Sequence, residues 1–192
     1  MTDTFRIALA QLDPVMGDIA GNIARARAAR AEAARGGAGL ILFPELFVVG
    51  YPPEDLVLNS ALQEEVRAAV EEWARETVDG GPAMLVGAPW TDGGRLYNAC
   101  LLLDQGRVVA HTYKRNLPNY GVFDEKRVFA AGPLPTPFDI RGVRIGVPIC
   151  EDIWAPETVG CLAQAGAEIF LVPNGSPFEA GKENVRLQLA HA

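Results

Sequence analysis

The chain has 192 residues, 49% of them hydrophobic and 21% charged, enough to build the core of one globular domain. A formal net charge of −7 without any run of Lys or Arg argues against nucleic-acid binding, and no apolar stretch or basic N-terminal start suggests a membrane span or a secretion signal. Three cysteines without paired spacing exclude a disulfide framework and favour a reducing cytoplasm, while two histidines without a Cys-x-x-Cys leave no metal site.

The first third of the chain predicts two strands separated by one helix. Residues 5–12 and 40–43 are short apolar runs, the first ended by Asp13-Pro14 and the second by Pro44, which is typical of buried strands. The alanine-rich segment 18–35 predicts a helix that Asp18 or Asn22 can cap and that Gly36-Gly37 can end. Glu45 comes directly after the second strand and its closing proline.

The middle of the chain predicts a loop, a helix and three strands. Residues 50–55 form the loop, and Ser60 with Gln63 is a candidate capping box for a helix whose apolar residues recur at helical spacing through Trp73. Residues 84–89, 96–104 and 107–113 predict strands, the last two antiparallel across the turn at 105–106. The polar segment 114–132 predicts irregular structure.

The last part of the chain centres on a strand that ends in a thiol. Residues 143–149 are apolar and β-branched, as in a buried strand, and Cys150, two carboxylates and Trp154 follow at once. Residues 156–166 predict a helix, 168–173 a strand, 174–177 a loop and 182–192 the start of another helix. Strands that alternate with helices, together with one β-meander, predict an α/β layered fold.

Three chemically competent side chains stand just beyond three of these strands: Glu45, Lys114 and Cys150. If the strands share one sheet edge, the three side chains converge. A thiol is a poor nucleophile until a base takes its proton, which a glutamate in a closed site can do, and a fixed lysine can stabilise the oxyanion that results. Each residue alone has a plainer explanation: core packing for the cysteine, a cap or solvated loop for the glutamate, a surface charge for the lysine.

Three ordered segments resemble the signature segments of the nitrilase (carbon–nitrogen hydrolase) superfamily. They are Phe43-Pro44-Glu45-Leu46, Tyr113-Lys114-Arg115-Asn116-Leu117 and Ile149-Cys150-Glu151-Asp152. The longer runs 114–120, 123–127 and 150–154 resemble, more narrowly, the glutaminase domain of the bacterial glutamine-dependent NAD synthetase family, from about Phe5 to the chain end.

The resemblance implies a four-layer αββα sandwich and a Glu-Lys-Cys triad. Glu45 would be the general base, Cys150 the nucleophile and Lys114 the positively charged third member, with Glu125 matching a second glutamate that orients the lysine or the substrate. As an exposed loop carboxylate, Glu125 has an equally good structural explanation.

The resemblance also implies a glutamine pocket formed by Tyr120, Ser176 and Lys182. From the residues alone, Ser176 is a turn residue, Tyr120 a half-buried aromatic and Lys182 a charge at a helix start.

Three of the other candidates are predicted to be structural. Cys100 and Cys161 are expected in the core, His111 is expected to be a structural strand residue, and Trp154 fits a pocket wall and core packing equally well. His191 lies at the very end of the chain.

The superfamily domain usually continues beyond a point like Ala192, so residues 1–192 are expected to be an incomplete, C-terminally truncated glutaminase domain. The resemblance implies a synthetase domain downstream that uses ATP and Mg²⁺, glutamine as substrate, no cofactor in this domain, and a homo-oligomer. The alternatives are a stand-alone nitrilase-type amidase or carbamoylase acting on another small amide, and a catalytically silent assembly fragment.

Overall fold

The computed structural model describes residues 4–177 and 180–191, which form two β-sheets and the helices around them. The larger sheet has five strands in the order β1 (Ile7–Leu9), β2 (Leu40–Leu42), β3 (Ala83–Asp92), β4 (Arg95–Asp104) and β5 (Arg107–Tyr113). β1, β2 and β3 are parallel neighbours, whereas β3, β4 and β5 form an antiparallel meander. The predicted meander is thus confirmed.

The smaller sheet has three strands: β6 (Phe138–Ile140), β7 (Val143–Gly146) and β8 (Ile169–Phe170). β7 pairs antiparallel with β6 and parallel with β8. β6 was missing from the sequence prediction, and the predicted strands at 143–149 and 168–173 are shorter in the structure. β7 ends at Gly146, and the chain then leaves the sheet and enters the short helix that begins at Cys150.

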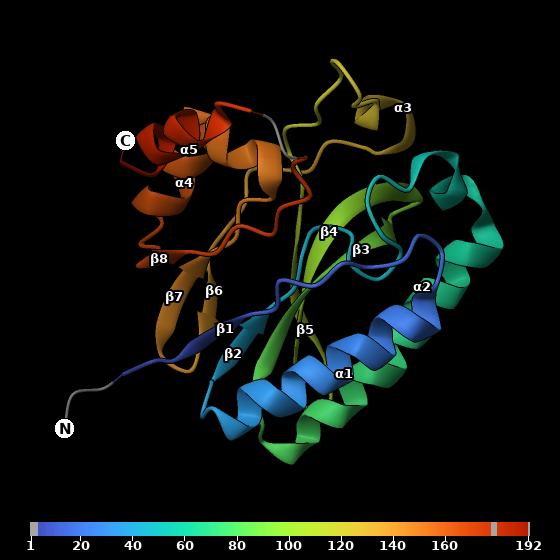
Figure 1. The fold of residues 1–192 in the computed structure, drawn as a ribbon, viewed down its shortest axis with the longest axis vertical. Coiled ribbons are helices and arrows are strands. Elements are labelled where there is room, and N and C mark those ends of the chain that lie inside the picture. Colours follow the sequence, from blue (N-terminus) through green and yellow to red (C-terminus); the bar gives the residue numbers. More distant parts are fainter. Residues whose placement is uncertain (1–3, 178–179, 192) are drawn as a thin grey trace.

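Helices α1 (Ile19–Arg35) and α2 (Ser60–Ala74) lie together against the five-stranded sheet, whereas α4 (Pro156–Gln164) and α5 (Lys182–His191) lie beside the small sheet on the opposite side of the molecule (Figure 1). Asp18 caps α1 by accepting a hydrogen bond from the backbone of Gly21, as predicted. α2 differs from the prediction: Asn59 is its N-cap, and Gln63 donates to the Val57 carbonyl instead of closing a capping box.

Two apolar clusters fill the spaces between the layers, and alternate residues of β2 belong to one cluster or the other. Ile41 faces the cluster that contains Trp73 and Val70 of α2, whereas Leu40 and Leu42 face the cluster that contains Ile145 of the small sheet. Successive strand residues point to opposite faces, so β2 is buried on both. Helices, large sheet, small sheet and helices therefore follow one another, which confirms the expected αββα layering.

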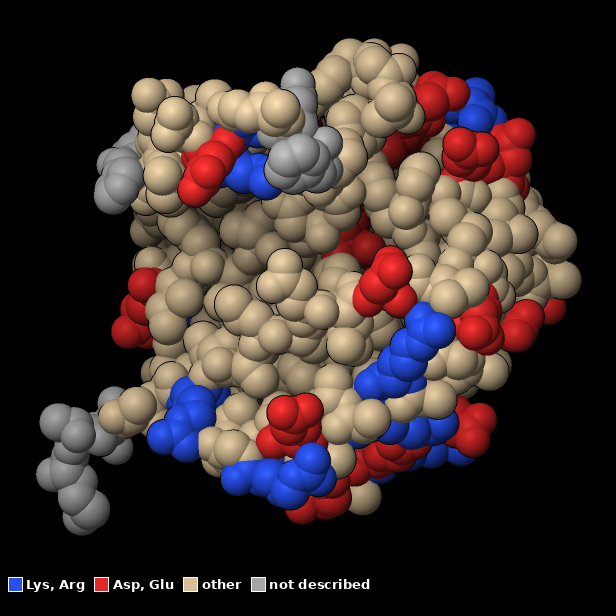
Figure 2. All heavy atoms as spheres, viewed as in Figure 1, with Lys and Arg blue, Asp and Glu red and all other residues tan. Residues whose placement is uncertain are grey.

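Three short helices connect these layers: η1 (Glu54–Leu58), η2 (Arg75–Asp79) and α3 (Glu125–Val128), the last within a segment predicted to be irregular. In the view of Figure 2 the charged side chains gather mainly over the two long helices and around α3, while the surface over the sheets is largely uncharged. Among the described residues no helix combines the length and apolarity needed to cross a membrane.

The predictions for the minor candidates are mixed. Cys100 is fully buried between the sheets, as expected. Cys161 was wrongly assigned to the core: it is half-buried on α4, where its thiol lies 3.7 Å from the carbonyl oxygen of Pro135. His111 is exposed on the edge strand β5, where its ring stacks on that of Tyr113.

Candidate active site

The ends of three strands bring Glu45, Lys114 and Cys150 to one buried place between the two sheets. Glu45 follows β2, Lys114 follows β5, and Cys150 opens the short helix η3 (Cys150–Trp154) after β7. The turn carrying Glu45 packs directly on β3 at Gly87. A Cβ at Gly87 would lie 2.4 Å from the backbone nitrogen of Leu46 and 2.5 Å from the carbonyl oxygen of Pro44, so only glycine permits this approach.

Lys114 is the electrostatic centre of the site. Its Nζ lies 2.7 Å from Oε1 of Glu45 and 2.7 Å from Oε1 of Glu125, and all three side chains are buried. Burial alone would lower the pKa of Lys114, but the two carboxylates outweigh it and raise that pKa above its ordinary value. For Glu125 burial dominates and raises the pKa, and the lysine offsets this only in part.

The carboxylates are held by further donors. Glu45 accepts a hydrogen bond from Asn98 Nδ2 at 2.8 Å on Oε1 and from the backbone N–H of Gly175 at 2.9 Å on Oε2. The hydroxyl of Tyr51 donates to Glu125 Oε1 at 2.8 Å. Glu125 is thus a buried partner of Lys114, and its explanation as an exposed loop carboxylate is excluded.

Cys150 is held in a left-handed backbone conformation, with φ of 47°, that non-glycine residues rarely adopt. Its N–H donates to the carbonyl of Pro173 at 3.0 Å, and its thiol lies 3.3 Å from Oδ1 of Asn174 and beside the carboxylate of Glu45. Burial and, next, the Glu45 carboxylate raise the pKa of the thiol to about 12, and Lys114 opposes this too weakly to reverse it. The resting group at neutral pH is therefore a neutral thiol that needs a base.

Asp152 fixes the turn that carries Cys150. Its buried carboxylate accepts from the backbone N–H of Ile149 at 3.1 Å, from that of Asn116 at 2.7 Å and from that of Arg115 at 3.1 Å. One carboxylate thus ties the strand end before Cys150 to the segment that follows Lys114. Burial raises the pKa of Asp152, and these donors oppose the rise.

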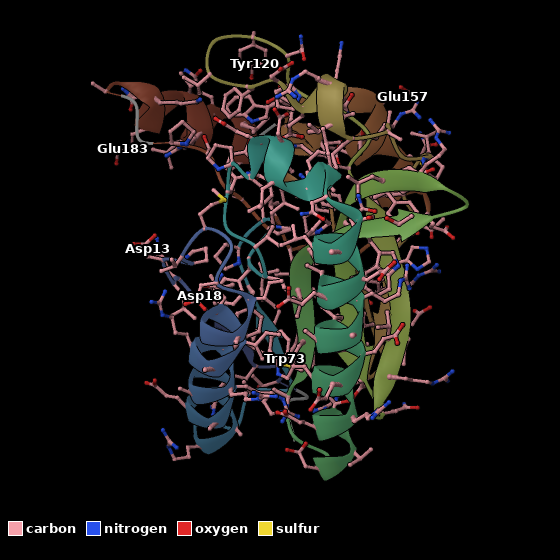
Figure 3. All side chains as sticks on the ribbon, turned by 90° about the vertical axis from the view of Figure 1, so that its right-hand side faces the viewer. Asp13, Asp18, Trp73, Tyr120, Glu157 and Glu183 are labelled. Carbon is pink, nitrogen blue, oxygen red and sulfur yellow. The ribbon has the colours of Figure 1, made fainter. Side chains whose placement is uncertain are left out.

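A cavity of about 250 Å³ opens onto Cys150. It is lined by Pro118, Tyr120, Phe123, Cys150, Glu151, Trp154, Ser176, Lys182 and Val185. The three residues expected to hold a substrate, Tyr120, Ser176 and Lys182, therefore share one cavity with the thiol. Tyr120 stands on the loop at one end of the molecule (Figure 3), and its hydroxyl lies 2.9 Å from Oε2 of Glu151.

Two features of the cavity extend the sequence analysis. Trp154 lines it, which favours the pocket-wall interpretation. Glu151 was not singled out, although its place next to Cys150 in the sequence was a signal for it. Within residues 4–177 and 180–191 no three His, Cys, Asp or Glu side chains cluster as metal ligands would.

Asn98, Tyr51 and Gly175 were also missed by the sequence analysis. They lie 53, 74 and 130 positions from the carboxylates that they contact, so no local pattern connects them to the site.

Several known proteins are similar to this chain in sequence and in fold. The family model of the carbon–nitrogen hydrolases matches residues 6–191. A glutamine-dependent NAD(+) synthetase of Rhodobacter capsulatus is 46% identical over the whole chain, which covers 35% of that relative. One from Xanthomonas campestris is 43% identical, over 95% of this chain and 33% of the relative. The chain thus spans about a third of the length of these curated relatives.

Solved structures of related proteins are also similar to this chain. A glutamine-dependent NAD+ synthetase from Acinetobacter baumannii superimposes with a TM-score of 0.91 at 40% identity, over 97% of this chain and 35% of that one. An amidase from Nesterenkonia sp. AN1, with acrylamide added at its active site cysteine, superimposes with a TM-score of 0.79 at 29% identity, over 93% of this chain and 70% of that one. The matched sequence, the αββα layers and the buried Glu45–Lys114 pair beside Cys150 agree, and this chain belongs to the carbon–nitrogen hydrolase family.

Proposed function

We propose that this chain is the glutaminase part of a glutamine-dependent NAD synthetase, in which Cys150 releases ammonia from the side-chain amide of glutamine. The observation that carries the proposal is the Cys150 thiol next to a buried carboxylate–ammonium pair, in a cavity that is also lined by one acidic and one basic side chain. The similarity to NAD synthetases over 95% or more of the chain supports the choice of substrate.

The reaction begins when Cys150 Sγ attacks the amide carbon and its proton passes to the Glu45 carboxylate. Lys114 contributes positive charge beside the oxyanion of the tetrahedral intermediate. Glu45 then returns the proton to the leaving nitrogen, the C–N bond breaks, and ammonia departs from a thioester on Cys150. A water molecule, deprotonated by Glu45, cleaves the thioester to glutamate and restores the thiol.

Glu125 acts in this scheme by holding Lys114. An ammonium group shared by two carboxylates at 2.7 Å keeps a fixed position and stays charged. Tyr51 donates to the same Oε1 of Glu125, so two donors fix the position of that oxygen.

The cavity suits an amino-acid amide better than a simple amide. Lys182 can pair with the α-carboxylate of glutamine and Glu151 with its α-ammonium group, while Tyr120 and Ser176 supply hydroxyls. Tyr120 already contacts Glu151, and the two can form one side of the recognition site.

The rest of the proposal rests on the similarity to glutamine-dependent NAD synthetases. Ammonia would pass to a synthetase domain of the same protein, which uses ATP and Mg²⁺ to amidate deamidated NAD. The complete protein would be a cytoplasmic homo-oligomer.

The test is a pair of rates on Cys150→Ala in the full-length protein. With glutamine as nitrogen source NAD formation should fall at least a thousandfold, because the covalent path is lost. With ammonium the rate should stay within about twofold, because ammonium bypasses the thiol. Cys161→Ala, which removes a thiol outside the cavity, is the matched control and should change neither rate.

Loss of both rates in Cys150→Ala would refute the division of labour, and loss of neither would refute the nucleophile. If the wild-type protein hydrolyses small aliphatic amides and leaves glutamine intact, the function is that of a stand-alone amidase instead.

A further inference from the structure

Asn98 is a polar residue at the centre of the apolar strand β4. Its neighbours Tyr97 and Ala99 are buried, and Asn98 itself has 0% of its surface exposed. Burying an amide costs free energy unless its donors and acceptor find partners. Asn98 Oδ1 finds none within the part of the chain that the structure describes. Nothing in the packing of the strand accounts for an asparagine here.

Two hydrogen bonds of Asn98 lead to the site. Its Nδ2 donates to Glu45 Oε1 at 2.8 Å, and its backbone carbonyl accepts from the N–H of Lys114 at 2.8 Å. One residue of β4 therefore fixes both the carboxylate and the start of the segment that carries the ammonium. The amide has only one acceptable orientation, because the reverse one would place Oδ1 against the carboxylate.

This arrangement makes the two oxygens of Glu45 unequal. Oε1 is occupied by Lys114 Nζ and Asn98 Nδ2, whereas Oε2 accepts from the backbone N–H of Gly175, which also lies against the Cys150 thiol. Oε2 is thus the oxygen on the side of the nucleophile. We propose that Asn98 is a positioning residue, which holds Oε1 so that Oε2 receives the proton of Cys150. This inference rests on the base and nucleophile roles proposed above.

Removing the amide should change the pH at which the site works. A hydrogen bond to the charged form of a carboxylate resists its protonation, so its loss lets the carboxylate take up a proton at higher pH. The other groups that face Glu45 stay in place: Lys114, the Cys150 thiol and Tyr51, with Glu125 across the lysine. The acid limb of Cys150 reactivity should therefore move upward in pH.

The readout is the rate at which iodoacetamide alkylates Cys150, followed by mass spectrometry of its peptide from pH 5 to pH 9. This rate needs no knowledge of the natural substrate. In Asn98→Leu the acid limb should move to higher pH, because the carboxylate loses a hydrogen bond to its charged form. Asn98→Asp should move it further, because two carboxyls in contact share a proton.

The matched control is Asn22→Leu. Asn22 is also fully buried, but its amide bonds to the backbone of Val15 and Val48 and to no side chain of the site. This variant should lower the melting temperature and leave the pH profile unchanged. Asn98→Leu, in contrast, should shift the pH profile of Cys150 alkylation whether or not its melting temperature changes.

Two outcomes separate the inference from the function on which it rests. If Glu45→Gln abolishes the acid limb but Asn98→Leu leaves it in place, Asn98 is merely structural and the inference is overturned. If Glu45→Gln itself leaves the acid limb unchanged, the assignment of Glu45 as base fails instead.

Discussion

Replacing Lys114 by methionine should destabilise the protein by an amount that depends strongly on pH. Methionine has a similar length and no charge, so the variant keeps the volume of the side chain and removes only the ammonium. Glu45 and Glu125 would then be buried near each other with no cation between them, although each now contacts Nζ at 2.7 Å. Removing one partner of a buried ion pair costs about 3–5 kcal/mol, a large part of a typical folding free energy of roughly 5–15 kcal/mol.

The cost should be largest at pH 8. Burial already raises the pKa of Glu125, and without the lysine its proton affinity in the folded state rises further. The folded variant then binds more protons than the unfolded chain, so its stability falls as pH rises. Proton uptake recovers at most about 1.4 kcal/mol per pH unit, hence up to about 3 kcal/mol between pH 8 and pH 5.5. Lys114 in the wild type stays charged across this range, because its pKa is raised.

Urea unfolding of wild type and variant at pH 8 and pH 5.5 measures both effects. Lys126→Met on the exposed surface of α3 is the matched control and should change stability by no more than about 0.5 kcal/mol at either pH. A loss below about 1 kcal/mol at pH 8, or equal losses at the two pH values, would show that the buried charges are not coupled as described.

Three further predictions concern the geometry around the thiol. Iodoacetamide should modify Cys150 first, since Cys100 is buried between the sheets with a raised pKa and the Cys161 thiol lies against a backbone carbonyl, that of Pro135; peptide mass spectrometry that finds Cys161 labelled first would contradict this. Gly175→Ala should slow alkylation by roughly a hundredfold, because the added Cβ would lie 2.8 Å from the ring of Tyr51 and 3.1 Å from Glu45 Oε2; an unchanged rate would show that the approach is not tight. Asp152→Asn should cost about 1–3 kcal/mol in unfolding free energy and slow alkylation, because backbone N–H groups lose an acceptor; full stability in urea would refute that bracing role.

The site residues that directly follow strands could be predicted from the sequence, whereas those within a strand could not. Glu45, Lys114 and Cys150 could be found because each directly follows an apolar run, and strand ends in layered α/β folds are where side chains are presented. Asn98 could not be found, because its position inside an apolar strand gives no hint that Glu45 lies across the sheet. The cap of α2 was misplaced by one residue because Asn59 and Ser60 are both good N-caps, and only the backbone geometry separates them.

Glu125 shows how context decides a role. As one carboxylate in a polar segment it had two equal explanations. The structure buries it on Lys114, where a second anion costs free energy unless it is shared with a cation. A purely structural ion pair would need one carboxylate for the one lysine, so the second is excess charge whose plainest use is to fix the ammonium in place.

The same excess charge explains why the thiol rests in its neutral form. A lone ammonium beside a cysteine lowers its pKa and produces a thiolate, but here Lys114 is already neutralised by two carboxylates. Burial and the Glu45 carboxylate then prevail, and the pKa of Cys150 rises to about 12. A neutral thiol becomes nucleophilic only as its proton moves to a base in contact with it. The reactivity of the site is therefore set by how Glu45 is held, which is why Asn98 and Gly175, neither of which was visible in the sequence, matter as much as the residues that were.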